Sequence, residues 1–170
     1  MKETCEVNRL IEEQNQPALG NILLVEDNHA DAILLTRAFA RAGVRNPVNH
    51  LAEGETAQKF LDSEGQYADR QMHPLPILMI LDLNLPGMSG LELVRWIRLQ
   101  RHLRRIPVLV LTSEREDRYM EAAYAAGANS YLLKSFDAEE INRVVDLISN
   151  YWLGYNESPL VVNKTANRPQ

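Results

Sequence analysis

The sequence predicts an α/β fold built on a doubly wound, five-stranded parallel sheet. From Asn21 onward, short apolar runs alternate with longer amphipathic stretches, and the alternation is completed five times. Such alternation is typical of strands joined by crossover helices. Two of the runs, Ile77–Leu81 and Pro107–Leu111, are apolar nearly throughout. This composition is expected of strands that helices cover on both faces.

The boundaries of the elements follow from local signals. The expected strands are Asn21–Val25, Pro47–Leu51, Ile77–Leu81, Pro107–Leu111 and Ser130–Leu133. The first helix is expected to begin just after Asn28 and to stop at Gly43, because glycine readily takes the left-handed conformation that closes a helix. Gly127 is expected to end the fourth helix for the same reason.

Capping residues mark the starts of the last three helices. Ser89-Gly-Leu-Glu92 and Ser113-Glu-Arg-Glu116 have capping-box spacing, and Asp137-Ala-Glu-Glu140 places acids at the same spacing. In the last helix, apolar residues at helical periodicity favour core packing over a partner-binding face. These residues are Ile141, Val144, Val145, Ile148 and Trp152.

Length and composition indicate a single folded unit. The 170 residues, of which 45% are hydrophobic, suffice for one buried core but not for two full domains. We expect a domain over residues 20–155, between an N-terminal tail (1–19) and a C-terminal tail (156–170). A short helical extension at Arg9–Glu13 and a surface loop at Ser63–Pro76 are further expectations.

The charge balance argues against nucleic acid and membrane surfaces as partners. The net charge is -5, whereas both of those surfaces attract basic proteins. Cys5 is the only cysteine, and neither a leader nor a membrane-spanning apolar run is visible, so we expect a cytoplasmic protein. The four histidines lack ligand spacing, and the arginines between residues 95 and 105 are interpreted as a solvated face.

Charged and polar residues follow four of the expected strands. Glu26 and Asp27 follow the first strand, Asp82 the third, Thr112 the fourth and Lys134 the fifth. Ligands of open parallel sheets bind at this edge. Each pair of carboxylates ~4 Å apart would repel by roughly 4 kcal/mol, so a cation or a proton is expected there. Mg²⁺ or Mn²⁺ fits, because such ions combine a few carboxylates with phosphate oxygens. Helix capping and loop turning would explain each acid alone but not all three together.

Two kinds of phosphate chemistry are disfavoured at this edge of the sheet. The acids after the first strand would repel a flavin phosphate. A phosphatase with an aspartyl nucleophile usually has a second acid two residues later, where this chain has Asn84. An acceptor that keeps its phosphoryl group remains, with Asp82 as nucleophile, Lys134 neutralising one phosphoryl oxygen and Thr112 hydrogen-bonding another. The expected metal ligands are Asp27, Asp82, the backbone carbonyl of Asn84 and, through water, Glu26.

Four motifs, in this order and spacing, resemble the receiver domains of two-component response regulators between Asn21 and about Asn156. They are Val25-Glu-Asp-Asn28, Leu81-Asp-Leu-Asn-Leu-Pro-Gly-Met-Ser-Gly90, Leu111-Thr-Ser113 and Gly127-Ala-Asn-Ser-Tyr-Leu-Leu-Lys134. The resemblance implies a flavodoxin-like (βα)5 fold with strand order 2-1-3-4-5. It also implies phosphorylation of Asp82 by a histidine kinase, movement of Thr112 toward the phosphoryl group and a rotamer change of Tyr131. From the sequence alone, the favoured interpretation of Tyr131 is a half-buried strand residue with a bonded hydroxyl.

Two details refine the resemblance. The loop before the third strand and the ending Tyr151–Asn156 look like the single-domain regulators paired with cyanobacterial phytochromes. The family usually has proline, often cis, after the site lysine, whereas this chain has Ser135. We expect a trans Lys134–Ser135 bond, because a cis bond to serine costs about 3 kcal/mol.

Asn84 and Glu114 lie two positions beyond Asp82 and Thr112 and are expected to orient the water that removes the phosphoryl group. We expect moderate self-dephosphorylation, in minutes or faster rather than hours, and no enzyme activity in the usual sense. Output is expected through protein contacts, since few residues follow Asn156. The aromatic residues of Tyr151–Tyr155 favour a homodimer.

Two other functional classes stay open at this point. One is a hydrolase of small phosphate esters that uses Asp82, which turnover above an Asp82→Asn variant would reveal. The other is a receiver-shaped interaction module that never binds phosphate. Such modules tend to lose the acidic pair, which this chain retains as Glu26 and Asp27.

Overall fold

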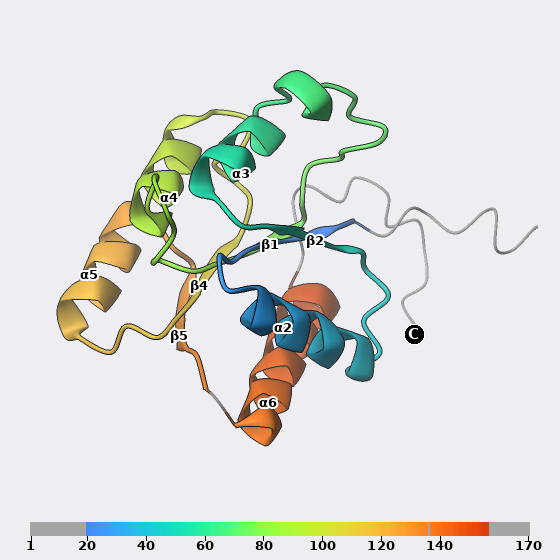
Figure 1. Cartoon of the computed structure of the whole chain (residues 1–170), viewed down its shortest axis with the longest axis vertical. Coiled ribbons are helices and arrows are strands. Elements are labelled where there is room, and N and C mark those ends of the chain that lie inside the picture. Colours follow the sequence, from blue (N-terminus) through green and yellow to red (C-terminus); the bar gives the residue numbers. More distant parts are fainter. Residues whose placement is uncertain (1–19, 136, 157–170) are drawn as a thin grey trace, which may run out of the picture.

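Helices cover both faces of a five-stranded parallel sheet with the order β2-β1-β3-β4-β5 (Figure 1). The computed structural model describes residues 20–135 and 137–156. The strands are β1 (Ile22–Val25), β2 (Val48–Leu51), β3 (Leu78–Leu81), β4 (Val108–Thr112) and β5 (Ser130–Leu133). All five predicted strands are confirmed, with ends that differ by at most one residue. The predicted tails and the Arg9–Glu13 helix lie outside the described residues, except for Asn156.

The connecting helices form two layers, α2 and α6 against one face of the sheet and α3, α4 and α5 on the other side (Figure 1). The α-helices are α2 (His29–Arg41), α3 (Gly54–Leu61), α4 (Gly90–Leu99), α5 (Asp117–Ala126) and α6 (Ala138–Ile148). A π-helical segment, η2 (Ser149–Tyr155), continues α6. A short 3-10 helix, η1 (Gly65–Tyr67), interrupts the predicted Ser63–Pro76 loop. Within the described residues, no helix combines the length and the apolar character needed to cross a lipid bilayer.

The core is divided by the sheet, because successive strand residues point to opposite faces. Leu23 and Val25 of β1 pack with α3 and α4, whereas Ile22 and Leu24 pack with α2 and α6. Every residue of β1, β3 and β4 is buried, as predicted for the apolar runs. The apolar stripe of α6 packs into the same layer as α2, which confirms its predicted place in the core.

Most of the predicted helix ends are confirmed. The side chain of Asn28 accepts hydrogen bonds from two backbone N–H groups at the start of α2. Ser89 and Glu92 form the reciprocal capping box, and Asp137 caps α6. Gly43 and Gly127 have φ values of +75° and +103°, the left-handed conformation that ends a helix.

The capping box predicted at Ser113–Glu116 is wrong. Helix α5 begins at Asp117, and its N-cap Glu116 makes no side-chain capping bond. The reason lies in the partners of Glu114, whose carboxylate accepts from Asn84 and whose backbone oxygen accepts from the Tyr131 hydroxyl. The segment is therefore bonded to the ends of β3 and β5 rather than wound into the helix.

Arg98 corrects the interpretation of the arginine stretch as a solvated face. Its guanidinium donates to the backbone oxygens of Gly127 and Ile106 at 2.8 and 3.0 Å and to the side chain of Asn129 at 2.9 Å. Burial lowers the pKa of Arg98, consistent with a guanidinium withdrawn from solvent. This arginine joins the end of α4 to the turn that leads into β5.

The register of the strands determines which side chains meet at the carboxyl edge. Val25 of β1 is paired with Leu81 of β3, so Glu26 and Asp82 leave the sheet at the same level. Thr112 of β4 is paired with Leu133 of β5, and the backbone N–H of Lys134 donates to the Thr112 oxygen at 2.8 Å. The carboxyl edge of the sheet therefore brings together Glu26, Asp82 and Lys134, which are far apart in the sequence.

Gly90 lies against the backbone of Asp82 and Leu83, and this close approach can be tested. A Cβ at position 90 would overlap the Asp82 carbonyl oxygen and lie 2.8 Å from the Leu83 Cα atom. We expect Gly90→Ala to lower the free energy of unfolding by about 1–3 kcal/mol, the usual cost of overpacking. The matched control is Gly154→Ala, whose nearest contact would be an ordinary 3.7 Å. Urea denaturation of both variants measures the difference, and equal stabilities would contradict the predicted overlap.

Candidate functional site

Three carboxylates meet at the carboxyl edge of the sheet. Glu26, Asp27 and Asp82 each offer an oxygen, and these oxygens all lie within 4.8 Å of one another. Glu26 and Asp82 are buried, whereas Asp27 is exposed. The structure thus brings together the predicted acids, and their donor set consists of hard oxygens on one open side of the sheet. Such a set fits Mg²⁺ or Mn²⁺, because these ions favour oxygen ligands and keep coordination sites for water or phosphate.

Lys134 provides the positive charge within this cluster. Its Nζ lies 2.6 Å from an oxygen of Glu26 and 2.6 Å from Oδ2 of Asp82, and its side chain is only 11% exposed. Burial acts to lower the pKa of Lys134, but hydrogen bonds to Asp82 and Glu26 outweigh it, so the net pKa is raised. The lysine therefore stays charged and offsets the repulsion between the acids.

Local turns account for only part of the bonding of these acids. A carboxylate oxygen of Glu26 accepts from the Asn28 N–H at 3.2 Å, and one of Asp82 accepts from the Asn84 N–H at 3.3 Å. These local bonds turn the chain after β1 and β3, but α2 is capped by Asn28 and not by Glu26 or Asp27, so the capping role considered for those two acids is wrong. The local bonds do not explain why acids from two strands share one ammonium group.

The backbone of Glu26 is contacted by the neighbouring strand β2, and its carboxyl group is buried. On the neighbouring strand β2, a ring nitrogen of His50 lies 2.7 Å from the backbone oxygen of Glu26. Burial raises the pKa of the Glu26 carboxyl despite the attraction of Lys134. A buried carboxylate in this setting favours a nearby positive charge.

A chain of hydrogen bonds connects the ends of β3, β4 and β5. Thr112 is fully buried, and its hydroxyl oxygen lies 3.4 Å from the Glu114 N–H. The Tyr131 hydroxyl donates to the Glu114 backbone oxygen at 2.9 Å, and the Asn84 amide donates to the Glu114 carboxylate at 2.8 Å. Burial, followed by the negative charges of Glu114 and Asp82, raises the pKa of Tyr131. Glu114 therefore links the predicted switch residues Thr112 and Tyr131 to Asn84.

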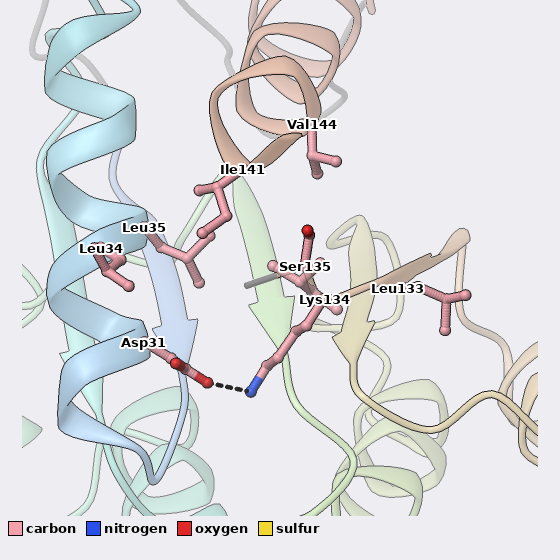
Figure 2. A pocket seen from close by; sticks show the side chains of 9 residues that line it. Asp31, Leu34, Leu35, Leu133, Lys134, Ser135, Ile141 and Val144 are labelled. Atoms are coloured by element: carbon pink, nitrogen blue, oxygen red, sulfur yellow. Dashed lines mark hydrogen bonds and ion pairs between the residues drawn. The ribbon is translucent and has the colours of Figure 1, made fainter. Parts of the chain in front are cut away.

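The segment that follows Lys134 has no cis bond. Among residues 20–135 and 137–156, every peptide bond is trans, so the Lys134–Ser135 bond is trans as expected. Figure 2 shows Lys134 and Ser135 on the wall of a pocket between α2 and α6, with Asp31 and Lys134 joined across its mouth. The other labelled lining residues are apolar, namely Leu34, Leu35, Leu133, Ile141 and Val144.

Comparison with known proteins places this geometry in a family. Residues 22–146 match the family model of the response regulator receiver domain. The chain belongs to the response-regulator receiver family. Receiver domains are signalling proteins of phosphorylation-based two-component systems rather than enzymes in the usual sense. The flavodoxin-like fold and the strand order implied by the sequence motifs are thereby confirmed.

Several relatives of this receiver cover nearly its whole folded part. FilR2 of Methanothrix harundinacea, described as a probable methanogenesis regulatory protein, is 41% identical over 81% of this chain and 86% of its own length. Response regulator Rcp1 of Synechocystis sp. is 35% identical over 84% of this chain and 93% of its own length. The crystal structure of phosphorylated RcpA, a cyanobacterial phytochrome response regulator, has a TM-score of 0.78 at 34% identity, covering 84% of this chain and 99% of RcpA.

One charged residue of the receiver site was not predicted from the sequence. Asp31, in the first turn of α2, places Oδ2 3.2 Å from Nζ of Lys134. An acid at this position has a sufficient local explanation, because negative charge is favourable at a helix N-terminus. Only the packing of α2 beside β1 and the reach of Lys134 reveal the contact.

The contribution of Lys134 to the receiver fold can be measured directly. Replacement with Met would leave Glu26 and Asp82 without their shared cation, and we expect the unfolding free energy at neutral pH to fall by about 3 kcal/mol. Because the folded-state pKa of Lys134 is raised above its ordinary 10.5, this stabilisation is complete below pH 10.5 and is lost as the pH rises through the raised value.

Chemical denaturation of the native protein and of Lys134→Met, from neutral pH to above pH 10.5, tests the prediction. Lys59→Met is the matched control, because Lys59 is exposed and lies in α3 away from the cluster. We expect the control to change stability by less than about 0.5 kcal/mol. A Lys134→Met variant as stable as this control would contradict the role given to the ammonium group.

Proposed function

We propose that this receiver accepts a phosphoryl group from a partner histidine kinase onto Asp82, with Mg²⁺ or Mn²⁺ bound at the acidic cluster. One observation carries the proposal. Asp82 shares Lys134 with Glu26 at 2.6 Å, and Asp27 offers a further oxygen within 4.8 Å, all at the open edge of the sheet. A nucleophilic carboxylate, a fixed ammonium and an oxygen set for a divalent cation are the groups that phosphoryl transfer requires.

In the transfer, the bond between phosphorus and the kinase histidine breaks as a bond from an Asp82 carboxylate oxygen to phosphorus forms. The electron pair of the broken bond stays on the histidine nitrogen. Lys134 is proposed to neutralise one phosphoryl oxygen and the Thr112 hydroxyl to donate to another. Asp27 and Asp82 would hold the metal directly, with the Asn84 carbonyl, and Glu26 through water. When bound, the metal neutralises charge on the phosphoryl oxygens.

The proposed switch uses the hydrogen-bond chain at Glu114. Movement of Thr112 toward a phosphoryl oxygen would pull on the Glu114 N–H, which lies 3.4 Å from its hydroxyl oxygen. The backbone oxygen of the same residue holds the Tyr131 hydroxyl at 2.9 Å. Phosphorylation would thereby change the rotamer of Tyr131 and alter the surface formed by α5, β5 and α6.

A phytochrome-type histidine kinase is the proposed partner. Support comes from the similarity to Rcp1 and to RcpA, which is a cyanobacterial phytochrome response regulator, and from the Mn²⁺-bound Rcp1 structure for the metal. We further propose output through protein contacts and a homodimer through the exposed aromatic residues Tyr151 and Tyr155. A cytoplasmic location and the division into domain and tails remain predictions from the sequence.

The proposed transfer predicts phosphorylation at a single residue. Incubation with acetyl phosphate and Mg²⁺ should add one phosphoryl group, which mass mapping should place on Asp82. Asp82→Asn should accept none, and chelation of the metal should prevent the reaction in the native protein. Asp27→Asn should weaken metal binding by about tenfold or more, because it removes a charged ligand. Labelling of Asp82→Asn to the native extent would refute the assignment of the acceptor.

The kinase partner is tested separately by transfer from a phosphorylated phytochrome-type kinase. A hybrid histidine kinase of unrelated input serves as the comparison. Transfer to the native receiver at least tenfold faster from the phytochrome-type kinase would support the pairing. Equal or slower transfer would reject it and leave the acceptor chemistry unaffected.

Dephosphorylation should depend on Asn84 and Glu114 acting together. Their side chains are bonded at 2.8 Å beside the acceptor loop, where they can orient an attacking water. We expect Asn84→Ala and Glu114→Ala each to lengthen the lifetime of the phosphorylated protein by about three- to tenfold. The double variant should differ little from the slower single variant, because each residue holds the other.

Decay of the acid-labile phosphate after removal of the phosphodonor provides the measurement. Glu116→Ala is the control, since Glu116 is exposed and pairs with Arg118 rather than with the site. Unchanged lifetimes in the Asn84 and Glu114 variants would show that neither residue positions the water.

A further inference from the structure

The Lys134 ammonium contacts carboxylates from three separate segments. Glu26 follows β1, Asp82 follows β3, and Asp31 lies in the first turn of α2. An ammonium group has three N–H donors, so these contacts use its full capacity. The roles of Glu26 and Asp82 are contained in the proposed function, whereas Asp31 has none there.

Lys134 reaches the cluster across a neighbouring strand. In the sheet, β4 separates β5 from β3, and β3 separates β4 from β1. Adjacent strands lie about 4.8 Å apart, so the lysine side chain has to extend past β4 to reach Asp82. The ammonium group is therefore at the end of a long and flexible stem. Such a group needs fixed partners to stay in one place.

Two of the three partners are shared with the metal site. The oxygens of Glu26 and Asp82 that contact Lys134 belong to residues of the acidic cluster. A divalent cation at that cluster would attract the same carboxylates and repel the ammonium. Asp31 does not belong to the cluster, so its attraction for Lys134 remains when the cation is bound.

The place of Asp31 is set by α2 and not by the cluster. Its backbone N–H donates to the capping side chain of Asn28 at 3.3 Å, and its carboxylate is favoured by the helix N-terminus. The side chain is 26% exposed and its Oδ2 lies 3.2 Å from Nζ of Lys134. Figure 2 shows the two side chains pointing toward each other, from the helix on one side and from the end of β5 on the other.

We propose that Asp31 is a positioning residue for Lys134. It retains the ammonium at the edge of the sheet when a divalent cation occupies the acidic cluster. Lys134 then stays within reach of a phosphoryl oxygen and competes less with the cation for Glu26 and Asp82. This inference rests on the proposed function and adds a residue that acts through Lys134 rather than on the phosphoryl group.

A double-mutant cycle separates action through Lys134 from the simple loss of a negative charge. The variants are Asp31→Asn, Lys134→Gln and the combination of the two. Mn²⁺ affinity is measured from the electron paramagnetic resonance of the free ion, without any phosphodonor. The phosphorylation rate with acetyl phosphate is then measured at saturating Mg²⁺, so that weaker metal binding does not contribute.

In the native background, we expect Asp31→Asn to weaken Mn²⁺ binding by about three- to tenfold and to slow phosphorylation by about tenfold. With Lys134→Gln present, both effects of Asp31→Asn should fall below about twofold. Asp31→Glu should recover most of both, because it keeps the charge on the same helix. Glu140→Gln, which removes an exposed acid from the first turn of α6, should change neither.

Equal effects of Asp31→Asn in both backgrounds would overturn the proposal, because a distant charge would then suffice. No effect in the native background would overturn it as well. These failures differ from failure of the proposed function, in which the native protein itself would bind no Mn²⁺ and accept no phosphoryl group.

Discussion

The repulsion between carboxylates at neighbouring strand ends is the constraint on which the rest of the site depends. The register of β1 and β3 places Glu26 and Asp82 at the same level, and the parallel order leaves them on one edge. At short range such charges cost several kcal/mol unless a cation joins them. Lys134, with a largely covered side chain, supplies that charge from the end of β5, two strands away from the strand that leads to Asp82. The raised pKa of the lysine and its low exposure are consequences of this arrangement.

The same edge determines the local structure of the loops around it. Ser113–Glu116 has the sequence of a helix start, yet Glu114 bonds to Asn84 and Tyr131 instead of capping α5. The side chain and the backbone of Glu114 thus connect Asn84, which follows β3, to Tyr131 of β5. In the proposed switch, this loop would pass a change near Asp82 to the Tyr131 side chain.

Relatives with the same fold are described by different signalling contexts. FilR2 is described as a methanogenesis regulator, and RcpA as a cyanobacterial phytochrome response regulator. The fold and the acidic edge define the chemistry of a receiver, whereas the choice of kinase depends on surface residues outside that edge. Membership of the receiver family therefore indicates phosphorylation-based signalling, whereas the similarity to RcpA is one of overall fold and sequence.

The sequence by itself determined the strands, most helix caps, and the identity of Glu26, Asp27, Asp82, Thr112 and Lys134 as edge residues. These features follow from local periodicity, capping chemistry and the rule that parallel strands end together. Only the tertiary structure decided that Asp31 contacts Lys134, that Arg98 of α4 binds the turn before β5, and that Glu114 bonds to Asn84 and Tyr131. Each of these contacts joins segments remote in sequence. The distances between these side chains depend on how the helices pack against the sheet, and a local sequence pattern does not determine that packing.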